Sequence, residues 1–238
     1  MYALQISRFG KPSDVVERVK IPDPDDPMAN EVLVAVEYAP INFSDLLTIR
    51  GQYGVLPSLP AGLGSEGFGR ILSVGEKVNH LKVGDRVLIP FSHSSWREKM
   101  MLPSTDLFPL PQGADPQQLS MLGINPPTAA LLLSEYVALS PDDWVIQNAG
   151  NSGVGRSVIA FAKERGLRTV SLVRRQELID ELVAAGGDIV LVDGAEASAC
   201  LSQQPILSSR PRKRSLMPKA AERCCSNSPN GLIGLTNQ

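Results

Sequence analysis

The chain has 238 residues, of which 43% are hydrophobic, enough for one large domain or two modest ones. A formal net charge of −2 gives no reason to expect nucleic-acid binding, and no stretch approaches the roughly 20 apolar residues that a membrane helix needs. The N-terminus enters a strand-like pattern at once, without the basic and apolar regions of a signal peptide, so we expect a soluble, cytoplasmic protein.

Residues 1–110 contain short stretches in which apolar and polar side chains alternate, the pattern of half-buried β-strands. These stretches cover residues 31–37, 69–74 and 85–89, with Gly and Pro turn signals between them. Many short strands punctuated in this way predict an antiparallel, partly closed β-domain. The pair Pro126-Pro127 and the apolar run Ala129–Leu133 mark the passage into a second domain.

A buried strand over residues 144–148 is followed by a glycine-rich turn and then by a helix. Glycines at 150, 153 and 155 allow a tight turn and let a pyrophosphate approach the backbone amides that begin the helix. A lone glycine pattern is weak evidence, but here the preceding strand and the following helix supply the context that the motif requires. The sequence predicts a dinucleotide-binding turn whose contacts are made by Asn151, Ser152, Gly153, Val154 and Gly155.

Beyond the turn, Val158, Ile159 and Ala162 lie at helical spacing, Gly166 is a candidate C-cap, and residues 169–173 form a β-branched strand. NAD-binding folds place Asp or Glu after this strand to hold the ribose 2′-hydroxyl, whereas this chain has Arg174 and Arg175. A guanidinium pairs with a 2′-phosphate, so NADPH is the expected cofactor. The alternative is that both arginines only solvate the start of a helix.

The last 41 residues, 198–238, differ from the rest of the chain in charge and composition. They hold six basic residues against one acidic residue, together with all three cysteines (Cys200, Cys224 and Cys225). This segment is either a disordered tail that does not belong to the fold, as a shifted reading frame would produce, or a basic tail for an anionic partner. We favour the first reading. The expected domains are therefore a β-rich domain over 1–120, a partial nucleotide-binding domain over 121–197, and the atypical tail.

Several segments, in this order and spacing, resemble the medium-chain dehydrogenase/reductases, and among them most closely the mitochondrial-type trans-2-enoyl-CoA/ACP reductases. They cover roughly residues 1–195 and comprise Ala39–Asp45, Arg50–Gly54, Gly64–Gly67, Ser95–Arg97, Leu122–Ala129 and Gln147–Gly155. The strands and the tyrosine loop also resemble quinone oxidoreductases. The resemblance implies an α/β fold, with a GroES-like (alcohol dehydrogenase-like) domain followed by a partial Rossmann doubly wound parallel sheet, and NADPH-dependent reduction of a carbon–carbon double bond in fatty acid metabolism.

Zinc-dependent members of this superfamily would need Cys before the Ser-Asp pair and His before the glutamate of the Gly-x-Glu-Gly segment. This chain has Phe43 and Ser65 at those positions, and its only histidines, His80 and His93, lie in no ligand-like cluster. We therefore expect a zinc-independent site with no metal.

Without zinc, the negative charge that builds up on the substrate oxygen during hydride addition requires a proton donor. Tyr53 is the candidate catalytic residue, because a phenol donates readily at neutral pH and glycines flank it at 51 and 54. The resemblance assigns the same role to this position. The alternative is a tyrosine that only packs locally.

The resemblance also places a cofactor contact at Asn125, and Trp96 is a candidate wall for the substrate pocket or, equally, a packing anchor. Asn42 and Asp45 are expected to organise a turn.

A family member would continue for about 100 residues beyond this chain and complete the sheet, so the sequence gives one half of the doubled fold. The missing half would supply nicotinamide contacts and part of a homodimer interface, which makes activity and dimerisation of this chain open questions. Three hypotheses follow: an NADPH-dependent enoyl thioester reductase, an NADPH:quinone oxidoreductase, and a non-catalytic dinucleotide-binding remnant. The first two take a small molecule, an acyl thioester or a quinone.

Overall fold

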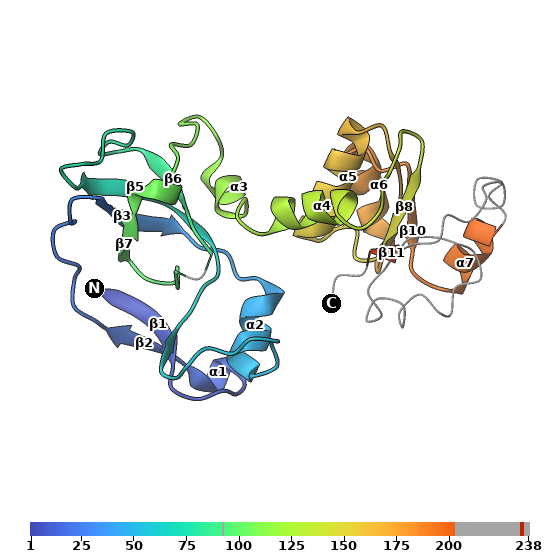
Figure 1. Cartoon of the computed structure of the whole chain (residues 1–238). Coiled ribbons are helices and arrows are strands. Elements are labelled where there is room, and N and C mark those ends of the chain that lie inside the picture. Colours follow the sequence, from blue (N-terminus) through green and yellow to red (C-terminus); the bar gives the residue numbers. More distant parts are fainter. Residues whose placement is uncertain (92, 203–233, 236–238) are drawn as a thin grey trace. The chain divides into compact units, whose positions relative to one another are not determined.

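The computed structural model describes residues 1–91, 93–202 and 234–235 (Figure 1). Their contacts divide the chain into two compact units, Met1–Ile124 and Asn125–Gln238. The predicted boundary after residue 120 lies at the end of the short helix α3 (Pro116–Ser120), four residues before this division. None of the helices that the structure describes is long and apolar enough to cross a membrane.

The first unit is mainly antiparallel, and two groups of strands build it. The smaller sheet has the order β2-β1-β4 and consists of β1 (Tyr2–Ile6), β2 (Val16–Lys20) and β4 (Ala61–Gly62). The larger sheet has the order β6-β5-β3-β7 and consists of β3 (Glu31–Tyr38), β5 (Gly67–Val74), β6 (Arg86–Ile89) and β7 (Lys99–Pro103). The strands predicted over 31–37, 69–74 and 85–89 are confirmed as β3, β5 and β6. Their inward-facing side chains, among them Val32, Val34, Ile71 and Val87, form one core.

The helices of the first unit are short: α1 (Pro12–Val15), α2 (Phe43–Arg50), α3 (Pro116–Ser120) and the 3-10 turn η1 (Ser104–Asp106). Val15 of α1 and Ile49 of α2 are buried with Ile6 of β1 in a second core. α2 begins at a capping residue, Asn42, whose backbone N–H donates to Asp45 at 2.8 Å. It ends at Gly51, which has the left-handed backbone (φ 71°) that glycine adopts without strain.

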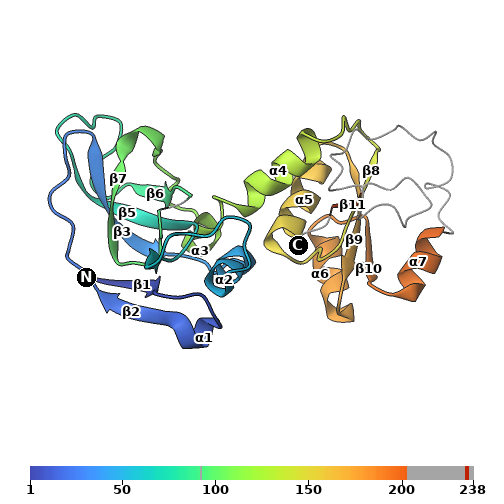
Figure 2. The ribbon, with the colours of Figure 1, turned by 60° about the horizontal axis from the view of Figure 1, so that its bottom comes forward.

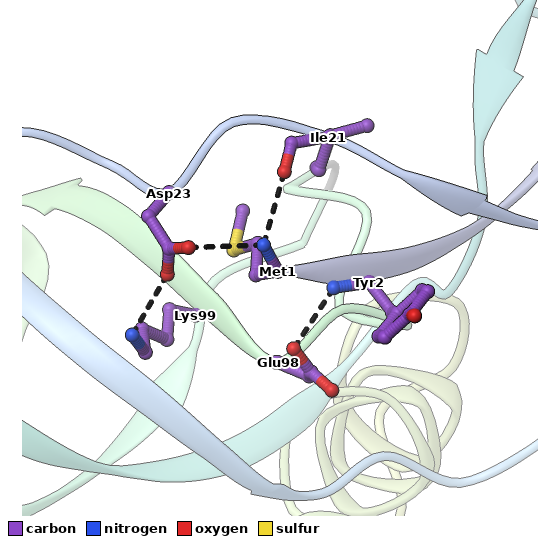
Figure 3. Close-up of polar contacts among 6 residues, drawn as sticks. All are labelled: Met1, Tyr2, Ile21, Asp23, Glu98 and Lys99. Carbon is purple, nitrogen blue, oxygen red and sulfur yellow. Dashed lines mark hydrogen bonds and ion pairs between the residues drawn. The ribbon is translucent and has the colours of Figure 1, made fainter.

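An ion-paired cluster ties the first strand of this unit to its neighbours (Figure 3). The Met1 ammonium donates to the carbonyl of Ile21 and to Asp23, both at 3.0 Å, and Lys99 donates to the other oxygen of Asp23 at 2.8 Å. The hydrogen bonds from Lys99 and from the ammonium lower the pKa of Asp23 below its ordinary value. Because Asp23 is 58% exposed, water and salt screen this cluster, and it fixes geometry more than it adds stability.

The second unit is a parallel α/β layer. Its sheet contains the parallel strands β8 (Trp144–Gln147), β9 (Arg168–Val173) and β10 (Ile189–Val192). The helix α5 (Gly153–Glu164) connects β8 to β9, and the 3-10 turn η2 (Gln176–Leu178) with the helix α6 (Ile179–Ala184) connects β9 to β10. The sheet order is β10-β9-β8-β11, where β11 (Gly234–Leu235) pairs in parallel with β8. α4 (Asn125–Ser134) precedes the sheet, and Figures 1 and 2 show α4 and α5 side by side.

α5 separates the two cores of this unit. Its Val158 and Ala162 are buried against Leu133 of α4 and Val145 of β8, whereas Ile159 faces β9, α6 and β10. The helix predicted from the spacing of Val158, Ile159 and Ala162 is confirmed as α5, and all three side chains are buried. The helix ends at Glu164 with Arg165 as its C-cap, one residue before the predicted Gly166; Gly166 follows with a left-handed backbone (φ 69°), and the Leu167 N–H donates to the carbonyl of Ala162.

The predicted tail begins inside a helix, because α7 (Ala195–Ser202) runs across residue 198. The expected boundary at residue 198 lies within this helix, and the division into domain and tail stays a prediction. Residues 234–235, which form β11, are the other part of this segment that the structure describes. The remainder of the tail, including Cys224 and Cys225, lies outside the described residues.

Candidate functional site

The glycine-rich turn joins β8 to α5 and brings free backbone donors to one place. Ser152 caps α5, and its Oγ accepts a hydrogen bond from the Gly155 N–H at 3.0 Å. Within the described residues, the N–H groups of Gly153 and Val154 have no acceptor. These two donors, at the positive end of a twelve-residue helix, form an arrangement that attracts an anion.

Gly155 is needed because the backbone crowds it. A Cβ at this position would lie 2.6 Å from the carbonyl oxygen of Gly150 and 2.8 Å from that of Ala149. Neither oxygen can move without moving the turn itself. The first turn of α5 therefore packs directly on the peptide groups that leave β8, which keeps its N–H groups close to the carboxyl edge of the sheet.

Asn125, the first residue of α4, lies against the same turn. A Cβ on Gly153 would be 2.7 Å from Asn125 Cγ, so the two helices begin in direct contact. Asn125 Nδ2 is buried and has no hydrogen-bond partner in the described part of the chain. Buried amide donors are normally satisfied, so this one is available for a polar group of a ligand.

Arg174 and Arg175 follow β9 directly and are exposed. Because β8 and β9 are parallel, their carboxyl ends share one edge, and the two arginines follow β9 at the edge where the turn follows β8. Arg175 Nε lies 3.5 Å from Glu177 Oε1, both side chains being more than half exposed, and no described residue makes an ion pair with Arg174. Asn151 takes part in the turn through its carbonyl, which accepts from Arg156.

Tyr53, in the first unit, lies in the loop after α2, two residues beyond the left-handed Gly51. Its side chain is 41% exposed, and no hydrogen bond to its hydroxyl is present among the described residues. The phenol is therefore accessible and is not engaged by a neighbouring group of its own unit.

Trp96 makes more contacts within its own unit than a residue that only lines a substrate pocket would need. Its indole N–H donates to the Pro40 carbonyl at 3.1 Å, and its ring packs against the core that contains Ile6 and Ile49. A Cβ on Gly64 would lie 2.4 Å from the ring. These contacts favour the packing interpretation of Trp96, and its role toward substrate stays a prediction.

A polar network that the sequence reasoning did not identify centres on Glu66, which is 1% exposed. Its carboxylate accepts from Asn42 Nδ2 and from the Ile124 N–H, both at 2.9 Å. Burial raises the pKa of Glu66 above its ordinary value, and these hydrogen bonds offset part of that effect. The signal in the sequence is a glutamate among small or apolar residues in the segment Gly64–Gly69, because a carboxylate that is buried there needs hydrogen-bond partners.

No group of three or more His, Cys, Asp and Glu side chains in the described ranges could hold a metal ion. His80 lies beside the Ser104 carbonyl and His93 beside the carbonyls of Pro90 and Phe91.

The two units, an antiparallel GroES-like domain followed by a Rossmann-like fold with a glycine-rich turn, define a chain of the medium-chain dehydrogenase/reductase type. The sequence profile of the alcohol dehydrogenase GroES-like domain matches residues 28–149, slightly more than half of the chain. The chain therefore belongs to the alcohol dehydrogenase GroES-like family.

Comparisons with individual proteins give the same assignment. The chain is 40% identical to the human mitochondrial enoyl-[acyl-carrier-protein] reductase over 197 residues, which are 80% of this chain and 52% of the human protein. It resembles the solved complex of the 2-enoyl thioester reductase of Candida tropicalis with NADP and crotonyl-CoA (28% identity, TM-score 0.74, 85% of this chain and 64% of that one). It also resembles Escherichia coli quinone oxidoreductase in complex with NADPH (26% identity, TM-score 0.71, 87% and 61%). The chain spans about half the length of the curated relatives that it matches.

Proposed function

We propose that this chain carries the dinucleotide-binding turn and the proton donor of an NADPH-dependent reductase that acts on the carbon–carbon double bond of trans-2-enoyl thioesters. The observation that carries the proposal is the donor set around α5. Two N–H groups and the Asn125 amide that lack partners among the described residues, together with two exposed arginines, belong to the elements that meet at one edge of a parallel sheet. The similarity to enoyl reductases then selects the reaction.

These residues fit a dinucleotide with a 2′-phosphate. The N–H groups of Gly153 and Val154 would hold the pyrophosphate, with Asn151, Ser152 and Gly155 shaping the turn. Asn125 Nδ2 would donate to the nicotinamide riboside end, and Arg174 and Arg175 would pair with the 2′-phosphate. NADPH, when bound, supplies the hydride.

Tyr53 would act on the substrate. Addition of hydride to the β-carbon sends electron density to the thioester oxygen, which needs a hydrogen-bond donor, and the α-carbon then takes up a proton. An accessible phenol can supply both the hydrogen bond and the proton. Trp96 would limit the acyl pocket only through the loop that it anchors.

Turnover of crotonyl-CoA by the full chain with NADPH tests the proposal. We expect NADPH oxidation with crotonyl-CoA and little with 1,4-benzoquinone. The Escherichia coli neighbour makes a quinone the second candidate substrate, and activity with benzoquinone alone would reject enoyl reduction. NADPH binding without turnover of either substrate would identify a non-catalytic dinucleotide-binding chain.

Tyr53→Phe should lower crotonyl-CoA turnover by about 10²–10⁴-fold while the Kd for NADPH is unchanged, because only the proton donor is lost. Tyr38→Phe is the matched control, since Tyr38 belongs to the same unit and is also 41% exposed. Equal turnover in wild type and Tyr53→Phe would remove Tyr53 from the mechanism.

The compartment is also a proposal. The cytoplasmic location expected from the sequence competes with the mitochondrial location that the names of the curated relatives give for those proteins. Immunodetection in fractionated cells of the source organism decides between the two.

A further inference from the structure

Gln147, the last residue of β8, places a polar side chain inside the second unit. It is 3% exposed, and its Nε2 donates to the carbonyl of Gly155 and to Ser171 Oγ, both at 3.0 Å. Ser171, on β9, is fully buried. An amide is costly to bury unless it is hydrogen-bonded, and here both Nε2 hydrogens have acceptors. This side chain therefore links β8, β9 and the first turn of α5.

The link reaches the peptide group that directly follows the two N–H donors, Gly153 and Val154, for which the described residues supply no acceptor. The Gly155 carbonyl belongs to the first turn of α5, so fixing its direction fixes the tilt of the Gly153–Gly155 peptides. Gly150 is held in the same way, because its N–H donates to the Leu172 carbonyl at 3.0 Å, and a Cβ on it would lie 2.7 Å from Ser171 Cβ. The turn is thus fixed at both ends by β9 and by the Gln147 amide.

We propose that Gln147, acting with Ser171, is a positioning residue for pyrophosphate binding: its amide holds the first turn of α5 so that the N–H groups of Gly153 and Val154 point at the ligand. This inference rests on the proposed NADPH site. It assigns to Gln147 a role in binding the pyrophosphate, which NADPH and NADH share, whereas binding of the 2′-phosphate depends on Arg174 and Arg175.

The test measures the Kd of NADPH and of NADH for the full chain by calorimetry. Gln147→Met keeps the length of the side chain and removes both hydrogen bonds. It should raise both Kd values by about tenfold, a change of about 1.4 kcal/mol in each case, and leave their ratio unchanged. If Gln147 only stabilised the fold, its substitution would not weaken the binding of both dinucleotides selectively while the ratio of the two Kd values stayed the same.

Thr169→Val is the matched control. Thr169 lies two residues before Ser171 on the same face of β9, is equally buried, and hydrogen-bonds Asp188 instead of the turn. We expect Thr169→Val to lower the melting temperature and to leave both Kd values within twofold of wild type. Ser171→Ala, a milder change that removes only the acceptor, should weaken both dinucleotides, and should add little in the background of Gln147→Met because the two residues share one hydrogen bond.

The outcomes separate this inference from the proposed function. Unchanged Kd values in both Gln147→Met and Ser171→Ala, a changed NADPH/NADH ratio, or an equal loss in Thr169→Val would overturn the role of Gln147 alone. A wild-type chain that binds neither dinucleotide would overturn this inference and the proposed function together. Weakened binding in Gln147→Met, in a chain that does not turn over crotonyl-CoA, would keep the positioning role and reject the reaction.

Discussion

Glu66 is a carboxylate whose ionisation opposes folding, because burial raises its pKa. The folded chain therefore binds the Glu66 proton more tightly than the unfolded chain does. The contribution of Glu66 to stability is greatest below its ordinary pKa of about 4.5 and falls as the pH rises through the folded value. Asp23, whose pKa is lowered, has the opposite sign, since its contribution is lost as the pH falls.

Glu66→Gln should remove this pH dependence. We expect the free energy of unfolding of wild type, relative to that of Glu66→Gln, to decrease as the pH rises above about 4.5 and through the raised pKa of the folded state. Urea denaturation at several pH values measures the difference. Glu76→Gln, at an exposed position of the same unit, is the control and should give no such slope. A difference that is constant with pH would contradict the prediction.

Arg174 and Arg175 are predicted to select the phosphorylated cofactor. The double variant Arg174→Ala/Arg175→Ala should raise the Kd of NADPH about tenfold or more and change that of NADH little, because charge-assisted hydrogen bonds to the 2′-phosphate are lost. Titration with both dinucleotides provides the measurement. Arg168→Ala, at the other end of β9 and paired with Asp188, should leave the preference intact. If the double variant still prefers NADPH, the two arginines do not select the cofactor and only solvate the start of the following helix.

At the scale of the element, α5 depends on its N-cap. Ser152→Ala removes the acceptor for the Gly155 N–H and should cost about 1 kcal/mol of unfolding free energy. Ser157→Ala is the control within the same helix, because Ser157 Oγ donates to the Gly153 carbonyl, an interaction that adds little to a helix. Equal losses of unfolding free energy for the two substitutions in urea denaturation would show that the cap stabilises α5 no more than the Ser157 hydroxyl does.

Local patterns were sufficient to predict most elements. The apolar spacing in α5 and the alternation in β3 and β5 arise from neighbours in the sequence, and they identified the buried faces. α5 begins at Gly153, inside the predicted glycine-rich turn, because Ser152 supplies the cap despite the low helix propensity of glycine. α4 was seen only as an apolar run, although Pro126 and Pro127 suit the first turn of a helix, where no N–H is required.

The polar part of the site was harder to predict, because its partners are distant in sequence. Glu66 contacts the Ile124 N–H 58 residues later, and Gln147 contacts Ser171 across 24 residues. Neither pairing has a local signature. The turn itself was recognisable because its glycines, its cap and its flanking strand are contiguous.

At the scale of the whole molecule, each unit carries cores built from its own residues. Leu133→Ala, which empties a fully buried site between α4 and α5, should cost about 2–5 kcal/mol in the second unit. Hydrogen exchange followed by mass spectrometry should show faster exchange in β8, β9 and α5, with β3, β5 and β7 much less affected.

Leu131→Ala is the control for this prediction, because Leu131 belongs to the same helix and is 54% exposed. It should leave exchange in both units near the wild-type rates. Equal acceleration of exchange in the two units by Leu133→Ala would mean that they unfold as one cooperative body.

The two units meet in the sequence without a spacer. Ile124, the last residue of the first unit, donates its N–H to Glu66, and Asn125, the next residue, packs on Gly153. A protease that cut this peptide bond would disturb the surroundings of a buried acid on one side and of the nucleotide turn on the other. Limited digestion should therefore spare this junction, and a natural insertion here would have to preserve both anchors.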